Sequence, residues 1–173
     1  MTFMKTWLLI AASIAATHAY AQNSDLMSKG NKGIYTSVKS NVLKAADAVS
    51  DADYGYKPTD KVRTFGELFA HIADGQYEFC SAALADKSEH PSVEKTKKTK
   101  GEIVDALKTA FSYCDKAYDE LTDAHAADEV SFFNRKLAKI NVLTFNTAHT
   151  DEHYGNLVTY MRMKGMVPPS SKQ

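Results

Sequence analysis

The chain has 173 residues, of which 44% are hydrophobic, and its 21 basic side chains are balanced by 21 acidic ones. This length is typical of a single domain. A balanced chain lacks the excess of Lys and Arg with which proteins neutralise phosphates, so a nucleic-acid partner is not expected.

The first 21 residues are typical of a secretory signal peptide. A lone Lys5 precedes an apolar run over residues 7–16, and Ala19, Tyr20 and Ala21 form an A-x-A cleavage site. The run of about 10 residues is too short for a membrane anchor, since spanning takes roughly 20. We therefore expect an exported chain of residues 22–173, periplasmic or secreted, with no membrane contact after cleavage. Removing one Lys and no acid leaves 20 basic and 21 acidic side chains, a net charge of −1.

Helical periodicity appears in four segments, at about residues 24–49, 64–86, 101–121 and 137–164. In the first segment we expect Ile34 and Val38 to face the core. Thr64, followed by Glu67 three residues later, predicts a capping box at the start of the second. Gly165, followed by two prolines, predicts the end of the fourth.

The joints between these segments are polar, and residues 130–133 in the third joint predict a short extended piece. The lysine-rich stretch at 95–100 fits a solvated connector better than a binding patch for an acidic partner. Four helices with loops of intermediate length predict an all-α, antiparallel four-helix bundle in one domain. Sites in such bundles are built from side chains on facing helices.

The two cysteines, Cys80 and Cys114, are compatible with two states. In an oxidising compartment they can form one disulfide, and as free thiols both can be ordinary core residues. Their spacing leaves both interpretations open.

The six histidines fall into two groups. His18 belongs to the signal peptide, and His90 and His125 lie in polar loops, where we expect them to be exposed. The other three, His71, His149 and His153, lie on or beside apolar stripes and are the candidates for chemistry.

His149 and His153 are four residues apart, which places them one above the other on a helix, in the middle of the expected inward face. Two imidazoles in this arrangement can converge on one metal ion, although core histidines with hydrogen-bond partners are the simpler alternative. His71, on the second helix, supplies a third imidazole and favours the metal. Three neutral imidazoles suit Zn, Ni, Cu or Fe and leave a coordination position open, as in catalytic sites.

The stretch from His149 to His153 also spells the H-x-x-E-H motif of inverted zinc proteases. Glu152 would point about 100° away from the histidine face, and only 20 residues follow His153 to supply a further acidic ligand. This interpretation is therefore set aside.

Further candidates lie close to the histidines in the sequence. Asp74 can orient a ligand or act as a base, although a solvated helix acid is the simpler alternative. Asn146 is the strongest additional pocket residue, because a buried amide needs partners. Tyr77 and Tyr154 can line a pocket or merely pack, and Gly75 can leave room for a ligand.

Two stretches, "DYGYKPTDKVRTFGELFAHIAD" and "NTAHTDEHYGNLVTYMRMKGMVPPSS", together resemble the DinB family, which includes the DinB/YfiT-like enzymes. The resemblance covers roughly residues 32–171. It implies an up-down-down-up four-helix bundle and one divalent ion, with Zn or Ni first and Fe or Mn as alternatives. The ligands carried over by position are His71, His149 and His153. It also implies a possible homodimer.

Characterised relatives in this family include thiol-dependent transferases and isomerases. The resemblance therefore implies a metal-dependent transferase or hydrolase that activates a thiol or water against an unknown small molecule. The alternative is a non-catalytic, exported metal-binding or stress-related protein. An accessible site with polar neighbours would favour the enzyme, and a sealed triad would favour binding alone.

Overall fold

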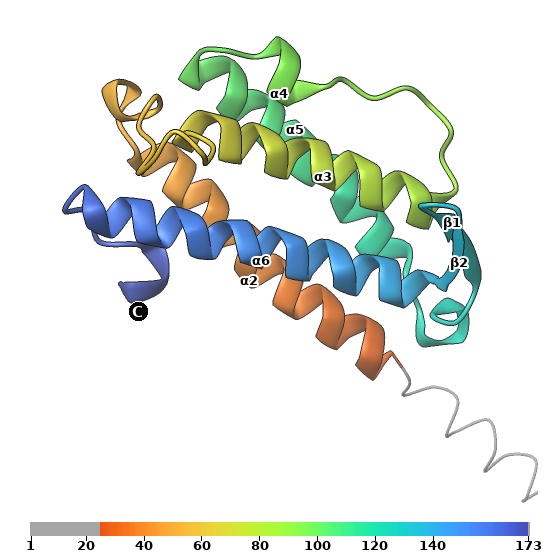
Figure 1. Ribbon diagram of the computed structural model, residues 1–173. Helices are drawn as coiled ribbons and strands as arrows, with labels where there is room; N and C mark the ends of the chain where they lie inside the picture. The colour runs from red at the N-terminus through yellow and green to blue at the C-terminus, as the bar shows by residue number, and fades with distance from the viewer. Residues whose placement is uncertain (1–24, 173) are drawn as a thin grey trace, which may run out of the picture.

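Four long helices make up most of residues 25–172, the part of the chain that the computed structural model describes (Figure 1). They are α2 (Leu26–Ala48), α3 (Phe65–Leu84), α5 (Lys100–Glu120) and α6 (Lys139–Met163). Each helix begins and ends within two residues of its predicted boundaries. The predicted four-helix bundle is confirmed. The predicted signal peptide lies outside the described residues.

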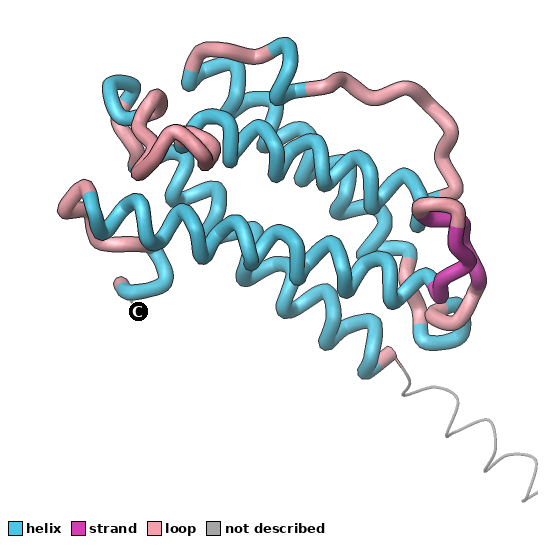
Figure 2. Tube along the Cα trace, viewed as in Figure 1, coloured by secondary structure: helices cyan, strands magenta, loops and turns pink. Residues whose placement is uncertain are grey.

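Shorter elements fill the connections (Figure 2). They are η1 (Asp51–Asp53), α4 (Val93–Thr96), η2 (Asp123–His125), the hairpin strands β1 (Glu129–Phe132) and β2 (Arg135–Ala138), and η3 (Pro169–Ser171). The strands pair antiparallel, so the extended piece expected around residues 130–133 is present. Over residues 25–172, the helices are either too short or too polar to cross a bilayer.

The directions of the helices follow from the contacts between them. α3 packs against α5 and α6, and α2 packs against the same two helices from the opposite corner. Residues 85–99 return along the length of the bundle, so α3 and α5 run in the same direction (Figure 1). Near their starts Gly66 approaches Ile103, and further along both helices Cys80 meets Cys114. The order is therefore up-down-down-up.

Capping boxes fix the start of two of these helices. Thr64 Oγ1 accepts from the Glu67 amide at 3.2 Å, and Glu67 Oε2 accepts from the Thr64 amide at 2.8 Å. The same reciprocal pair, Thr99 with Glu102, begins α5. This pair also has the T-x-x-E spacing that indicates a capping box. It starts α5 at Lys100, one residue before the predicted start.

The inward face of α2 differs from the prediction at one position. Ile34 is 63% exposed, whereas its neighbour Tyr35 is 2% exposed. The Tyr35 hydroxyl donates to the Phe111 carbonyl at 3.1 Å and contacts Asp115 at 3.0 Å, which ties α2 to α5. One residue rotates a helical side chain by about 100°, so with Tyr35 and Val38 inside, Ile34 faces solvent.

Cys80 and Cys114 form a disulfide that joins α3 to α5, with their Cα atoms 5.2 Å apart. Both residues are completely buried. The bond lies in the centre of the core, and it answers the question that the spacing of the cysteines left open.

Candidate metal centre

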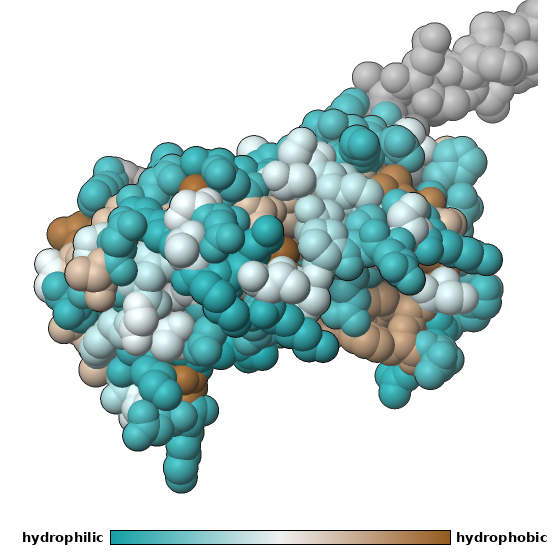
Figure 3. Space-filling view, turned by 90° about the horizontal axis from the view of Figure 1, so that it is seen from above, coloured by the Kyte–Doolittle hydropathy of each residue, from teal (hydrophilic) through white to brown (hydrophobic). Residues whose placement is uncertain are grey.

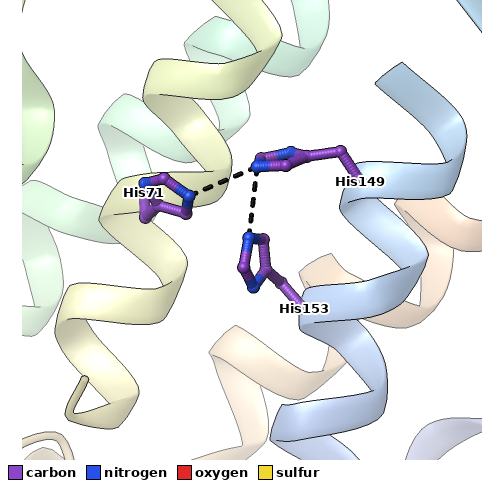
Figure 4. Close-up of side chains that lie close together, drawn as sticks. All are labelled: His71, His149 and His153. Atoms are coloured by element: carbon purple, nitrogen blue, oxygen red, sulfur yellow. Dashed lines mark hydrogen bonds between the residues drawn. The ribbon is translucent and has the colours of Figure 1, made fainter. Parts of the chain in front are cut away.

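His71, on α3, and His149 and His153, on α6, bring their rings together between the two helices (Figure 4). The His149 Nε2 atom lies 3.2 Å from His71 Nε2 and 3.1 Å from His153 Nε2. All three ligand atoms lie within 4.8 Å of one another. Helices adjacent in space but distant in sequence thus supply the cluster.

This arrangement fits a metal ion better than a set of hydrogen bonds. At Zn–N distances of about 2.0–2.1 Å, two ligand nitrogens of a tetrahedral site lie about 3.3 Å apart, close to the two short separations seen here. Without an ion, both short contacts meet at the single Nε2 of His149. Its Nδ1 is buried and has no hydrogen-bond partner among residues 25–172.

Glu94 contacts the ring nitrogen of His71 that faces away from the cluster. This contact was not predicted from the sequence. The Glu94 Oε2 atom lies 3.4 Å from His71 Nδ1, and Oε1 accepts from Arg63 Nε at 2.7 Å. Metal-bound histidines usually donate the second ring N–H to such a carboxylate, which fixes the tautomer and leaves Nε2 free for the ion.

Asp74, a predicted neighbour of the centre, acts on the backbone of the segment that carries Glu94. Its carboxylate accepts from the amides of Val93 at 2.6 Å and Glu94 at 3.1 Å. These bonds satisfy amides at the start of the four-residue α4. Asp74 therefore holds in place the residue that contacts His71.

The two histidines of α6 lie at the edge of its buried face rather than in the middle, as the sequence analysis had placed them. Thr150 and Tyr154 occupy the core positions, at 1% and 5% exposure, whereas His149 and His153 are half-buried. Apolar periodicity cannot separate an edge from a centre one residue away. The edge position leaves the cluster accessible from one side.

The environment favours the neutral form of the two imidazoles on α6. Burial lowers the pKa of His149 to about 4, with further lowering from the charges of His153 and His71. Burial also lowers the pKa of His153, helped by the charge of His71. Neutral rings can offer a lone pair to a metal without first losing a proton.

Gly75 makes room for His149 rather than directly for a ligand. A Cβ at this position would lie 2.8 Å from His149 Cε1 and 3.1 Å from Nδ1. The ring therefore sits where any other residue would place its side chain.

Asn146 belongs to a buried polar network below the histidines. Its Nδ2 donates to Gln76 Oε1 at 3.0 Å, and Gln76 Nε2 donates to Thr150 Oγ1 at 2.9 Å. The same amide lies 3.3 Å from the sulfur of Cys114. These contacts place Asn146 in the core, beside the disulfide.

Tyr77 and Tyr154 have partners elsewhere. Tyr77 stacks on His90 with ring centroids 4.8 Å apart, so His90 is packed in an aromatic contact rather than exposed as expected. Tyr154 donates to Ser170 Oγ at 3.0 Å and anchors the C-terminal turn. His125 is exposed, as expected, and contacts Asp128.

The fold and the cluster together define a four-helix-bundle protein with three convergent histidines. Residues 34–157 match the family model of the DinB superfamily. This match covers more than half of the chain, which therefore belongs to the DinB superfamily.

Several relatives share this bundle. The uncharacterized protein YjoA of Bacillus subtilis (strain 168) is 26% identical over 123 residues, which is 69% of this chain and 79% of YjoA. A DinB-like protein of Bacillus cereus ATCC 10987 superposes with a TM-score of 0.71 at 20% identity, over 82% of this chain and 95% of its own.

Two further structures with a similar fold have names that mention chemistry. YfiT from Bacillus subtilis, described as a probable metal-dependent hydrolase with an unusual four-helix bundle topology, gives a TM-score of 0.62 at 14% identity. That match covers 80% of this chain and 88% of YfiT. A mycothiol-dependent maleylpyruvate isomerase gives the same score and identity, over 75% of this chain and 60% of its own.

Proposed function

We propose that the protein is a divalent-metal-dependent enzyme, and that its reaction is a hydrolysis. The observation that carries the proposal is the convergence of three imidazole Nε2 atoms at the half-exposed edge of α6. A sealed triad would favour storage or structural binding of an ion, whereas an accessible one leaves room for a substrate.

His71, His149 and His153 would hold the ion, with Zn or Ni the best suited to three imidazoles and Fe or Mn as alternatives. A divalent ion at an open histidine site supplies a nucleophile near neutral pH, because it lowers the pKa of a water or thiol that binds it. Glu94 keeps His71 oriented, and Arg63 places a positive charge beside the centre.

Water is the better candidate than a thiol as the activated group. A fully buried Cys80–Cys114 disulfide suits an oxidising compartment, and the signal-like first 21 residues support export to such a compartment. Free low-molecular-weight thiols belong to the reducing cytosol. A thiol-dependent transferase reaction, as in the similar isomerase, is therefore the second choice.

The first test is metal content per chain by elemental analysis, for wild type and for His71→Ala and His149→Ala. We expect about one equivalent of Zn or Ni in wild type and loss of it in both variants. His125→Ala, which removes an exposed histidine outside the cluster, is the matched control and should keep the metal.

Wild-type protein that is folded, metal-free and unable to take up added Zn, Ni, Mn or Fe would rule out the metal site. The metal-loaded wild type is then compared with His149→Ala in the hydrolysis of simple esters such as p-nitrophenyl acetate. Equal rates for the two proteins would favour a non-catalytic metal-binding protein.

A further inference from the structure

The two helical rows that carry the histidines continue into aromatic side chains. On α3, His71, Gly75 and Phe79 follow one another at four-residue steps, and on α6 Phe145 lies one such step before His149. Residues four apart share a helix face. The faces of α3 and α6 that carry the histidines therefore continue into aromatic side chains.

The contacts form a continuous series. The Phe79 ring lies 5.3 Å from the His149 ring and 5.1 Å from that of Phe145, measured between centroids. Phe132, on β1, lies 4.9 Å from Phe79, and Phe133 follows at 4.3 Å from Phe132. We call these four phenylalanines the aromatic strip.

Two members of the aromatic strip are buried and two face solvent. Phe79 and Phe132 are buried, whereas Phe145 is 51% exposed and Phe133 is 63% exposed. A pale brown, apolar area is visible toward the hairpin end of the molecule (Figure 3). The two exposed rings flank the buried Phe132 ring, with centroids 6.2 Å from it for Phe145 and 4.3 Å for Phe133. Exposed apolar side chains grouped in this way are typical of a binding surface.

Phe133 is also in an unfavourable backbone conformation. It is the first of the two residues that connect β1 to β2, with φ of 46°, and Asn134 follows with φ of 61°. Such two-residue turns favour Asn, Asp or Gly, and a bulky residue at positive φ is uncommon. Folding gains little from an exposed ring at this position, which points to a role in binding.

The side chains on the other side of the histidines, toward the start of α3, are charged. Arg63 and Glu94 form an ion pair there, and Glu94 reaches His71. The histidines therefore lie between a charged end and an aromatic end, so a molecule bound at the centre and longer than a few ångströms must lie along one or both.

We propose that the aromatic strip binds an aromatic group of the substrate, attached to the reacting group that lies at the three histidines. This inference rests on the proposed metal-dependent function. Because Phe79 packs directly on His149, the aromatic group would begin within one ring of the reacting group.

Two hydroxamates with the same zinc-chelating group, acetohydroxamate and benzohydroxamate, test the proposal on zinc-loaded protein by calorimetry. We expect wild type to bind benzohydroxamate more tightly. Phe145→Ala should weaken benzohydroxamate by about 3- to 10-fold, the range of one aromatic contact. Phe133 lies three ring contacts from His149, so Phe133→Asn should weaken only a longer ligand, 4-phenylbenzohydroxamate, by a similar factor. Both should leave acetohydroxamate unchanged.

The variants are chosen so that they fold. Both side chains are exposed, and Asn suits the positive φ at position 133 better than Phe does. Ile34→Ala, on α2 and also 63% exposed, is the matched control and should change neither affinity.

The outcomes separate the two proposals. If none of the hydroxamates binds the wild type, the proposed metal-dependent function is wrong, whatever the role of the aromatic strip. If acetohydroxamate binds and neither aromatic hydroxamate loses affinity in its variant, the aromatic strip is not a substrate site. A change of sedimentation coefficient in the variants, without a change in selectivity, would instead identify the strip as an interface between two copies.

Discussion

At Gly75 the absence of a side chain has a direct consequence for the centre. The His149 ring occupies the space next to its Cα, with Cε1 at 2.8 Å from where a Cβ would stand. The Nδ1 atom of the same ring is buried. A single methyl group at this point would push His149 away from the other two histidines.

We therefore predict that Gly75→Ala weakens zinc binding by at least about tenfold, as expected when one of three ligands is displaced. Competition with a chromophoric chelator would measure this. Gly155→Ala is the control, since a Cβ there meets nothing within 4 Å. It should leave the affinity unchanged and stabilise α6 by about 1 kcal/mol through helix propensity. Equal affinities in the two variants would contradict the assignment of Gly75.

At the level of elements, the short α4 positions Glu94 beside His71. Four residues do not form a stable helix alone. This helix is held by two hydrogen bonds from its backbone amides to the Asp74 carboxylate and by the ion pair between Glu94 and Arg63. The segment thereby delivers one carboxylate to His71.

We predict that Glu94→Gln lowers zinc affinity by about 10- to 100-fold, the usual effect of losing a carboxylate behind a metal-bound histidine. Glu89→Gln, an exposed residue of the same connector, is the control. In metal-free wild type, ¹⁵N-edited NMR should find the His71 proton on Nδ1. A proton on Nε2, or equal affinity in the two variants, would show that Glu94 has only a structural role.

The long helices and the histidines were predictable because each is encoded locally. Apolar periodicity and the Thr64–Glu67 box placed the helices, and the four-residue spacing placed His149 over His153. Glu94 was not predictable, because it lies in a polar, lysine-rich connector where no period or cap separates it from solvated neighbours. Its role depends on a contact with α3 that only folding creates.

Ile34 and the α6 histidines show a second limit. A stripe of apolar residues defines a helix face to within about one residue, or 100°. That precision places a helix in the bundle, but it does not separate Ile34 from Tyr35, or the core position Thr150 from the edge position His149. The openness of the centre depends on this distinction.

At the scale of the whole molecule, the metal-free protein should lose stability in mild acid. His149 has an ordinary pKa of 6.5 when unfolded and about 4 when folded, so between these values the unfolded chain binds a proton that the folded chain does not. The free energy of unfolding therefore falls as the pH drops through this window. Urea denaturation in excess chelator at several pH values would measure it. His149→Gln should show a shallower pH dependence than wild type, and identical slopes would refute the prediction.

The three histidines of the candidate centre come from α3 and α6, and His71 and His149 are 78 positions apart in the sequence. The disulfide joins α3 to α5 and leaves this closure to packing and to the ion. The centre does not exist until α6, the last long helix of the chain, has docked. An ion held by these histidines, as proposed, can bind only to a chain in which α3 and α6 are already packed together. Histidine sites alone rank Cu and Ni above Mn and Fe, so such a site would take its metal from the free ions of the compartment in which the chain folds.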